Sequence, residues 1–151
     1  MPNDAKQSKH AASRELQDIV RPAMAETVRY RCRGKHVVAI LLTVAGGLFA
    51  GTNGIAVPQE ECPRKARGCR RGEGWDLCRE ICGQSGHAEA NAIRAAGARA
   101  IGGTLLLFGH DTVCEDCVTL MRQAGIDRYI VMPDACGKEG VEVPVSANSL
   151  M

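Results

Sequence analysis

Gly86-His87-Ala88-Glu89-Ala90-Asn91-Ala92-Ile93 and the later Cys114-Glu115-Asp116-Cys117 are the two stretches around which this 151-residue chain is organised. One histidine and two cysteines can hold a zinc ion and leave a fourth position open, as catalytic zinc sites do. Glu89 stands two residues after His87, where a carboxylate can move protons beside the metal. The two stretches therefore predict a zinc site made by His87, Cys114 and Cys117 with Glu89 as its acid–base group. A closed zinc site that only holds the fold is the alternative, and it would need a fourth ligand.

Both stretches fall where helices are expected to begin. The first helix is expected over residues 87–98, which are rich in Ala, with Ala88, Ala92 and Ala95 on one side. The second is expected over 115–124, with acidic residues in its first turn and a Gly after it. A helix N-terminus carries partial positive charge, which lowers the pKa of a cysteine and favours the thiolate as a metal ligand.

Composition indicates a soluble protein and gives little support for nucleic acid as a partner. The net charge is only +2, and aromatic residues make up 3% of the chain, so there are few platforms on which bases could stack. Residues 1–14 are polar and contain no apolar secretory segment. The longest apolar run, 37–50, is too short to span a membrane. We expect a cytoplasmic protein, in which clustered cysteines bind metal more often than they form disulfides.

The order of expected elements predicts an α/β protein. Residues 1–14 are expected to be frayed or disordered, and 15–151 to form a single domain with a Cys-rich insert at about 55–86. A helix is expected over 13–33, a pair of strands over 36–43 and 48–51, and further strands over 103–108, 128–132 and 141–145. Strand and helix alternate from residue 87 onward, which favours a mixed, largely parallel sheet with helices on both faces.

The insert contains four cysteines, for which two interpretations remain open. Cys62, Cys69, Cys78 and Cys82 could together hold a second, structural zinc ion, or some of them could be free thiols. Their spacings include no tight Cys-x₂-Cys pair, and His110 and Cys136 are further candidate partners. Cys32 is expected to be a small buried residue on a helix.

The insert also carries a run of positive charge. The sharper interpretation is a phosphate clamp, for which Arg is well suited because it binds phosphate with two parallel hydrogen bonds; the other is a solvated basic loop. The basic residues of this run are Arg64, Lys65, Arg67, Arg70 and Arg71.

Two residues near the end of the strand expected over 103–108 are also candidates. His110 either lines the pocket near the metal or caps this strand, and Phe108 is expected in the core.

His-x-Glu followed by Cys-x-x-Cys is a zinc-deaminase signature, and the chain resembles the cytidine deaminase superfamily. It is most similar to the deoxycytidylate (dCMP) deaminase branch, because residues 87–93 follow the form of that branch. Asn53-Gly54 after a short strand and Ala124-Gly125-Ile126 after the second helix fit as well. The resemblance covers roughly residues 36–132. In one respect the chain departs from it: the family usually has Pro before the first Cys of the pair, where this chain has Val113.

The resemblance implies a three-layer α/β/α cytidine deaminase-like fold and a homo-oligomer. It also implies His87, Cys114 and Cys117 as zinc ligands, Glu89 as proton shuttle and Asn53 as a contact to the sugar. The reaction would be hydrolytic loss of ammonia from C4 of cytosine, with dCMP converted to dUMP, and Arg64, Arg70, Arg71 and His110 would be the other substrate-binding candidates. Deamination of free cytidine or deoxycytidine is the main alternative. An editor of bases in RNA or DNA is the less favoured one.

Overall fold

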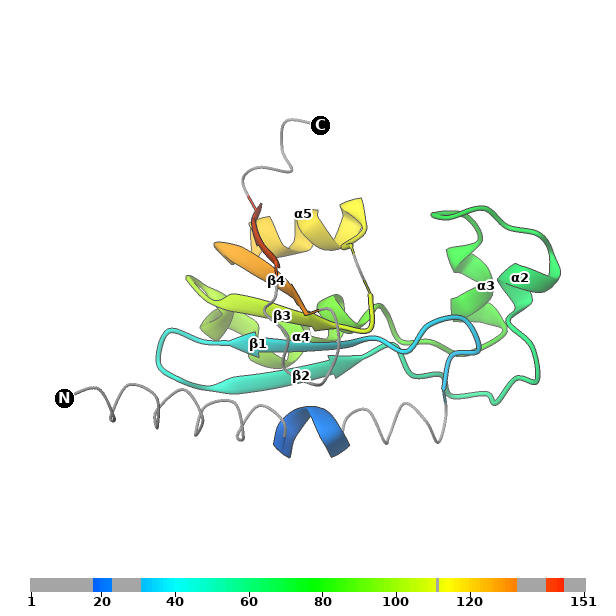
Figure 1. Cartoon of the computed structure of the whole chain (residues 1–151), viewed down its shortest axis with the longest axis horizontal. Coiled ribbons are helices and arrows are strands. Elements are labelled where there is room, and N and C mark those ends of the chain that lie inside the picture. Colours follow the sequence, from blue (N-terminus) through cyan, green and yellow to red (C-terminus); the bar gives the residue numbers. More distant parts are fainter. Residues whose placement is uncertain (1–17, 23–30, 111, 133–140, 146–151) are drawn as a thin grey trace.

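The computed structural model describes residues 18–22, 31–110, 112–132 and 141–145 (Figure 1). The expectation of a frayed segment at 1–14 and most of the helix expected over 13–33 lie outside these residues. Within them, residues 18–22 are helical. The remaining elements in chain order are β1 (Val38–Leu42), β2 (Leu48–Thr52), α2 (Pro63–Ala66), α3 (Trp75–Glu80), α4 (Ala88–Ala96), η1 (Gly97–Ala100), β3 (Thr104–Phe108), α5 (Glu115–Gln123), β4 (Arg128–Met132) and β5 (Val141–Pro144).

The strands form one five-stranded sheet in the order β2-β1-β3-β4-β5. Within the described residues, only β3 and β4 are parallel; β1 pairs with both β2 and β3 in antiparallel fashion, and β4 pairs antiparallel with β5. The expectation of a largely parallel sheet was therefore wrong. A tight turn closed by Thr43 N–H on the Gly47 carbonyl (2.9 Å) makes β1 and β2 a hairpin, and a hairpin is necessarily antiparallel. The strand–helix–strand unit β3-α5-β4 is the one that supplies a parallel pair.

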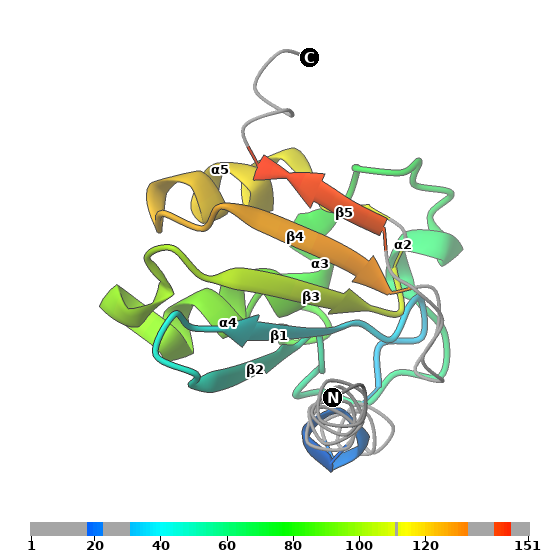
Figure 2. The same cartoon turned by 60° about the vertical axis from the view of Figure 1, so that its left-hand side comes forward.

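The two faces of the sheet are covered differently. Alternate residues of β1 face opposite ways, so Ala39 and Leu41 join a core with α4 and α5, whereas Val38 and Ile40 join a second core with Val20 of the 18–22 helix. Figure 2 shows α4 and α5 on the same side of the sheet and the 18–22 helix apart from them. The α/β architecture is as expected, but the two longer helices share one face instead of flanking the sheet.

Small side chains bring α4 against the hairpin. Ala88, Ala92 and Ala96 are buried against the sheet, whereas Ala95, which was expected on this side, is exposed. Positions 88, 92 and 96 are four residues apart and therefore lie along one stripe of the helix. Opposite them is Gly51 of β2, where a Cβ atom would lie 2.2 Å from the Ala88 carbonyl oxygen and 2.4 Å from the Ala92 nitrogen. The backbones of α4 and β2 thus touch directly.

The segment before β1 differs from expectation, and the insert contains two short helices. Arg31, Cys32 and Arg33 are not helical; instead, the Arg33 Nε donates to the Gln59 carbonyl (2.6 Å) and ties this segment to the insert. The insert is not structureless, because it folds into the short helices α2 and α3. Pro63 at the first turn of α2 suits a helix start.

Among the described residues, no helix is long and apolar enough to cross a membrane.

Replacing Gly51 with Ala is expected to lower the free energy of unfolding by about 2 kcal/mol or more, because the added methyl group collides with the backbone of α4. Urea denaturation measures this change. Ala50→Ser, on the exposed side of the same strand, is the matched control and should shift stability by less than about 0.5 kcal/mol. Equal stability of the two variants would contradict the close packing of α4 on β2.

Candidate metal centre and substrate pocket

The predicted metal ligands meet where two helices begin. His87 is the N-cap residue of α4 and Cys114 that of α5, and Cys117 lies in the first turn of α5. The three potential ligand atoms all lie within 4.8 Å of one another. His87 Nδ1 is 3.3 Å from Cys114 Sγ and 3.5 Å from Cys117 Sγ. A cluster of one imidazole and two thiols with short mutual distances fits a tetrahedral zinc ion that keeps one position open.

The electrostatics of the cluster favour a metal cation. A hydrogen bond from the Cys117 thiol is the largest of the effects that lower the pKa of Cys114, to about 4, and the contact with His87 adds to it. The same hydrogen bond, together with burial, raises the pKa of Cys117. The hydrogen bond with Cys114 raises the pKa of His87 in spite of its burial. Cys114 is thus the more acidic of the two thiols. A bound cation would displace the proton of Cys117 as well, because zinc binds cysteine as the thiolate.

Glu89 is a buried acid beside the ligands. It lies in the first turn of α4 and is 5% exposed. Burial raises the pKa of its carboxyl group, although hydrogen bonds to its backbone and to Cys117 oppose the shift. A carboxyl group whose pKa is raised toward neutrality can both accept and release a proton, which is the property that acid–base catalysis requires.

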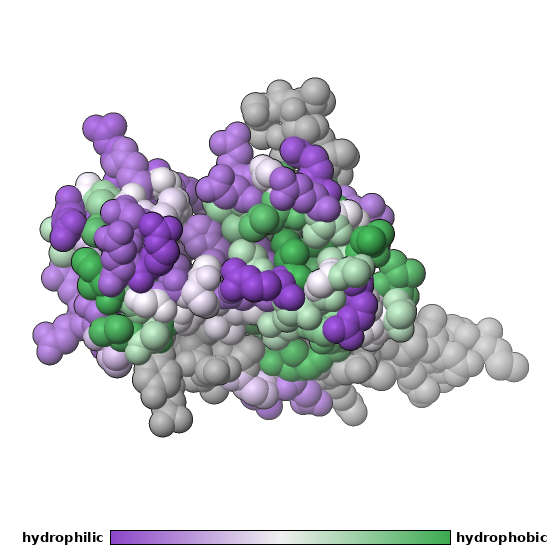
Figure 3. Space-filling model, turned by 180° about the vertical axis from the view of Figure 1, so that it is seen from behind, coloured by the Kyte–Doolittle hydropathy of each residue, from purple (hydrophilic) through white to green (hydrophobic). Residues whose placement is uncertain are grey.

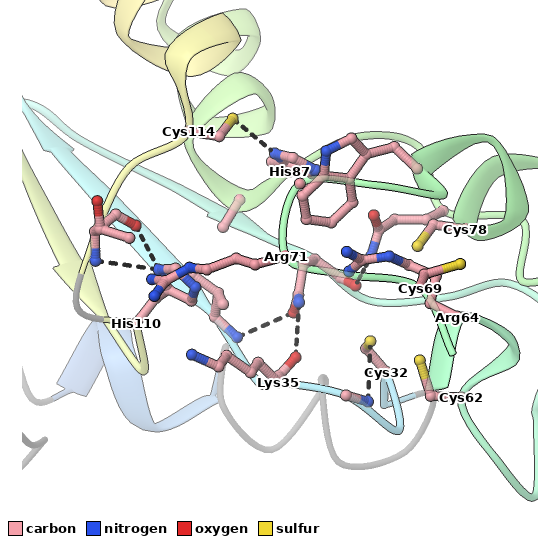
Figure 4. Close-up of a pocket in the computed structure, with 18 of the residues that line it drawn as sticks. Cys32, Lys35, Cys62, Arg64, Cys69, Arg71, Cys78, His87, His110 and Cys114 are labelled. Carbon is pink, nitrogen blue, oxygen red and sulfur yellow. Dashed lines mark hydrogen bonds between the residues drawn. The ribbon is translucent and has the colours of Figure 1, made fainter. Parts of the chain in front are cut away.

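The cluster opens into a cavity of about 640 Å³, a size typical of small-molecule sites. Figure 4 shows residues from the insert, from the segment before β1 and from the loop after β3 arranged around this cavity. All five residues predicted to bind substrate line it together with the metal ligands His87 and Cys114 and with Glu89; they are Asn53, Arg64, Arg70, Arg71 and His110.

Asn53 forms part of the cavity's framework. Its side-chain oxygen accepts from the Val37 N–H (3.0 Å), and its side-chain amide donates to the Lys35 carbonyl (2.7 Å). The Gln84 side chain in turn donates to the Asn53 carbonyl (2.7 Å). Asn53 thus joins β2 to the segment before β1, and it is 8% exposed.

Asn91 of the first motif has a similar positioning role. Its side-chain amide lies within hydrogen-bonding distance of the Thr52 carbonyl (2.9 Å), the Ser85 hydroxyl (3.3 Å) and the Gly86 carbonyl (3.4 Å). These contacts fasten α4 to the end of β2 and to the loop immediately before His87. The asparagine of the motif therefore sets the position of the histidine that precedes it.

Two residues that sequence reasoning missed also line the cavity. Trp75 lies edge-on to the His87 ring, with ring centroids 4.5 Å apart, and the Arg64 guanidinium lies 3.8 Å from the centroid of Trp75. Lys35 adds a positive charge from outside the insert. One sequence signal pointed to Trp75: it is the sole tryptophan of the chain and lies in a polar segment. No sequence pattern linked Lys35 to the motifs.

Other predicted residues take different places. Phe108 is buried in the second core, as expected. Val113, which stands where the family usually has Pro, is buried in the core beside α4 and α5. His110 contacts the Thr112 backbone through its Nδ1 and also lines the cavity. Val113 therefore contributes to the core immediately before the Cys-x-x-Cys motif.

The cysteines of the insert are unevenly placed. Cys62, Cys78 and Cys82 are buried, whereas Cys69 is half-buried. Cys32, which was expected on a helix, instead lies in the non-helical segment before β1 and lines the cavity with Cys62, Cys69 and Cys78. Among the described residues, only His87, Cys114 and Cys117 gather at metal-ligand distances within 4.8 Å.

Comparison with known proteins gives the family. Residues 13–133 match the family described as "Cytidine and deoxycytidylate deaminase zinc-binding region". A search of curated proteins gives no match. Among solved structures, cytidine deaminase from Burkholderia pseudomallei is 15% identical with a TM-score of 0.47, over 84% of this chain and 93% of that one. Acinetobacter baumannii RibD, form 2, is 16% identical with a TM-score of 0.44, over 80% of this chain and 28% of that one.

The family match spans the metal ligands and most of the described structure. It begins before β1, ends after β4 and includes the whole cavity described above. The chain spans only 28% of the RibD chain that it resembles. The chain belongs to the cytidine and deoxycytidylate deaminase zinc-binding family, and His87, Cys114 and Cys117 form the His/Cys/Cys zinc-binding triad typical of that family.

Proposed function

We propose that the protein converts dCMP and water to dUMP and ammonia. The observation that carries this proposal is the positive charge of the cavity: Lys35, Arg64, Arg70 and Arg71 line the same space as His87 and Glu89. A nucleoside has no negatively charged group that could pair with these cations, whereas a nucleotide carries a phosphate dianion that can bind them.

The basic residues divide into two groups by their contacts. The Arg64 Nε donates to the Glu73 carbonyl (2.7 Å) and its guanidinium stacks on Trp75, so Arg64 mainly holds the insert in shape. Arg70 and Arg71 are exposed residues that line the cavity, and Figure 4 shows the Arg71 side chain extending toward His110. Hydrophilic side chains also predominate over the outer part of the insert (Figure 3). We assign the phosphate to Arg70 and Arg71, with Lys35 contributing charge nearby.

In the proposed reaction, Glu89 carries protons between water and the cytosine ring. A zinc ion held by His87, Cys114 and Cys117 supplies Lewis acidity that makes water nucleophilic near neutral pH. The Glu89 carboxylate accepts a proton from the water that adds to C4 and donates it to N3 of the ring. A second proton passed through the same carboxyl group reaches the 4-amino nitrogen, which leaves as ammonia. Burial raises the pKa of Glu89, which makes its carboxyl group easier to protonate than an exposed one and suits it to pass protons in both directions.

Three further expectations stay predictions. These are the assembly of the chain into a homo-oligomer, its cytoplasmic location, and the contact of Asn53 with the sugar. The position of Asn53 on the wall of the cavity supports the proposed contact with the sugar.

Glu89→Gln is expected to lower kcat by about 100-fold or more while leaving the zinc content unchanged, because Gln keeps the shape of the side chain but cannot carry the proton. Steady-state kinetics with dCMP and metal analysis on the same sample measure both quantities. Glu80→Gln, an exposed acid on α3 away from the cavity lining, is the control and should behave as wild type. Full activity of the Glu89→Gln variant would refute the proton-shuttle role.

The phosphate assignment is tested by replacing Arg70 and Arg71 together with Ala. We expect kcat/KM for dCMP to fall at least about tenfold, because charge-assisted hydrogen bonds to the phosphate are lost, with little change for deoxycytidine. The control is Arg67→Ala, which removes an exposed arginine of the same insert that does not line the cavity.

Two results would overturn the nucleotide assignment. One is a wild-type enzyme that deaminates deoxycytidine or cytidine as efficiently as dCMP. The other is a double variant that loses activity equally on nucleotide and nucleoside, because a specific phosphate contact cannot affect a substrate that has no phosphate.

A further inference from the structure

Trp75 is a partly exposed side chain of the insert that reaches His87 of the zinc-binding triad. Its helix, α3, buries Leu77 and Cys78, whereas Trp75 is 38% exposed and lines the cavity. The centroids of the Trp75 and His87 rings lie 4.5 Å apart, with 67° between the ring planes. Rings in this edge-to-face arrangement attract one another beyond the apolar area that they bury. The contact therefore joins the insert to a metal ligand.

The orientation of the His87 ring decides whether it can serve as a ligand. Its Nδ1 lies 3.3 Å from Cys114 Sγ and 3.5 Å from Cys117 Sγ. His87 is half-buried and is the N-cap residue of α4, so its backbone is extended and its ring is not packed within the helix. A turn of the ring to another rotamer would take Nδ1 away from both thiols. Histidines that bind metals are held by a neighbour that contacts the rest of the ring.

Arg64 holds Trp75 in place from α2. Its guanidinium carbon lies 3.8 Å from the centroid of the Trp75 ring, which is a cation–π contact. The Arg64 Nε donates to the Glu73 carbonyl (2.7 Å). A Cβ atom on Gly74 would lie 3.4 Å from Arg64 Cγ, so the stem of the arginine runs along the backbone just before Trp75. In Figure 4, Cys114 and Arg64 lie on opposite sides of His87.

The turn that precedes α3 closes on the same arginine. The Glu73 N–H donates to the Arg70 carbonyl (3.0 Å), and the Arg70 N–H donates to the Glu73 carboxylate (3.2 Å). A second guanidinium nitrogen of Arg64 lies 3.5 Å from the Arg70 carbonyl oxygen. Contacts thus run without a break from this turn through Arg64 and Trp75 to His87.

We propose that Trp75 is a positioning residue of the metal centre, which keeps the His87 ring turned toward Cys114 and Cys117. Arg64 acts through Trp75 by fixing the plane of the indole. Neither α2 nor α3 is long enough to be stable on its own, so the stack depends on both helices being packed together. The inference rests on the zinc-binding triad and not on the identity of the substrate.

Zinc affinity in the absence of substrate tests the role of Trp75. We expect Trp75→Ala to bind zinc about fivefold more weakly than wild type, because the edge-to-face contact is lost, and Trp75→Phe to stay within about twofold because it keeps a ring. Competition with a chromogenic zinc chelator measures the affinity. A tryptophan that only touched the substrate would not affect this quantity. Wild-type affinity in Trp75→Ala, or equally weak binding by both variants, would overturn the proposal.

A double-mutant cycle tests whether Arg64 acts through Trp75. Arg64→Ala is expected to weaken zinc binding about threefold when Trp75 is present and to have no further effect in the Trp75→Ala background. Arg99→Ala is the matched control, because Arg99 lies over the ring of Phe49 (4.5 Å) and does not line the cavity. It should leave zinc affinity unchanged. Equal losses from Arg64→Ala in both backgrounds would contradict the link.

The wild-type chain allows a test that needs no variant, because Trp75 is its sole tryptophan. Indole emission responds to the charge and hydrogen bonding of groups that touch the ring. We expect the emission of the metal-free protein to change as zinc is added and the change to end at about one equivalent. Zinc that binds without altering the emission would contradict the contact between Trp75 and the ligand. A failure of the dCMP assignment would leave all three zinc measurements unaffected.

Discussion

The direct contact between the backbones of α4 and β2 is the constraint on which the rest of the structure depends. Gly51 has no side chain, and the stripe of Ala88, Ala92 and Ala96 lets the helix approach until its backbone touches the strand. That approach fixes the start of α4, where His87 and Glu89 lie, relative to the sheet. Because α5 packs on the same face, its own first turn brings Cys114 and Cys117 to the same point. A metal site made from two distant motifs thus follows from helix packing on one face of a sheet.

The insert completes a centre that the sheet and helices only begin. Its α2 and α3 place Trp75 against the ring of His87 with Arg64 over Trp75, and its loop adds Arg70 and Arg71 to the wall of the cavity. The insert thereby bears on both the metal ligand and the proposed phosphate site. A substrate cavity built from a short insert needs some means of holding that insert in place, since α2 and α3 are too short to be stable alone. Hydrogen bonds from Arg33, Arg64 and Gln59 supply part of this support.

The sequence predicted the chemistry better than the topology. Histidine, glutamate and cysteines at fixed spacings are required by the metal, so the motif located its own ligands and the helix starts that carry them. Strand direction has no such local signature: alternation after residue 87 suggested a parallel sheet, whereas the β1–β2 hairpin made most of the pairs antiparallel. Spacing also could not show that Cys32 lies beside Cys62, or that Lys35 reaches the cavity, because tertiary contacts between distant segments set both. The buried stripe of α4 was predicted to include Ala95, whereas the structure buries Ala96 instead. The sequence did not show which side of the helix faces the sheet.

The most direct test of this metal centre and its substrate is anomalous diffraction at the zinc edge from crystals of the zinc-loaded protein with dCMP bound. We expect a peak bonded to His87, Cys114 and Cys117 at about 2.0–2.3 Å with no fourth protein ligand, and a nucleotide whose cytosine ring lies beside Glu89 and whose phosphate meets Arg70 and Arg71. A zinc ion closed off by a fourth protein ligand, or a nucleotide bound away from this cavity, would contradict this expectation.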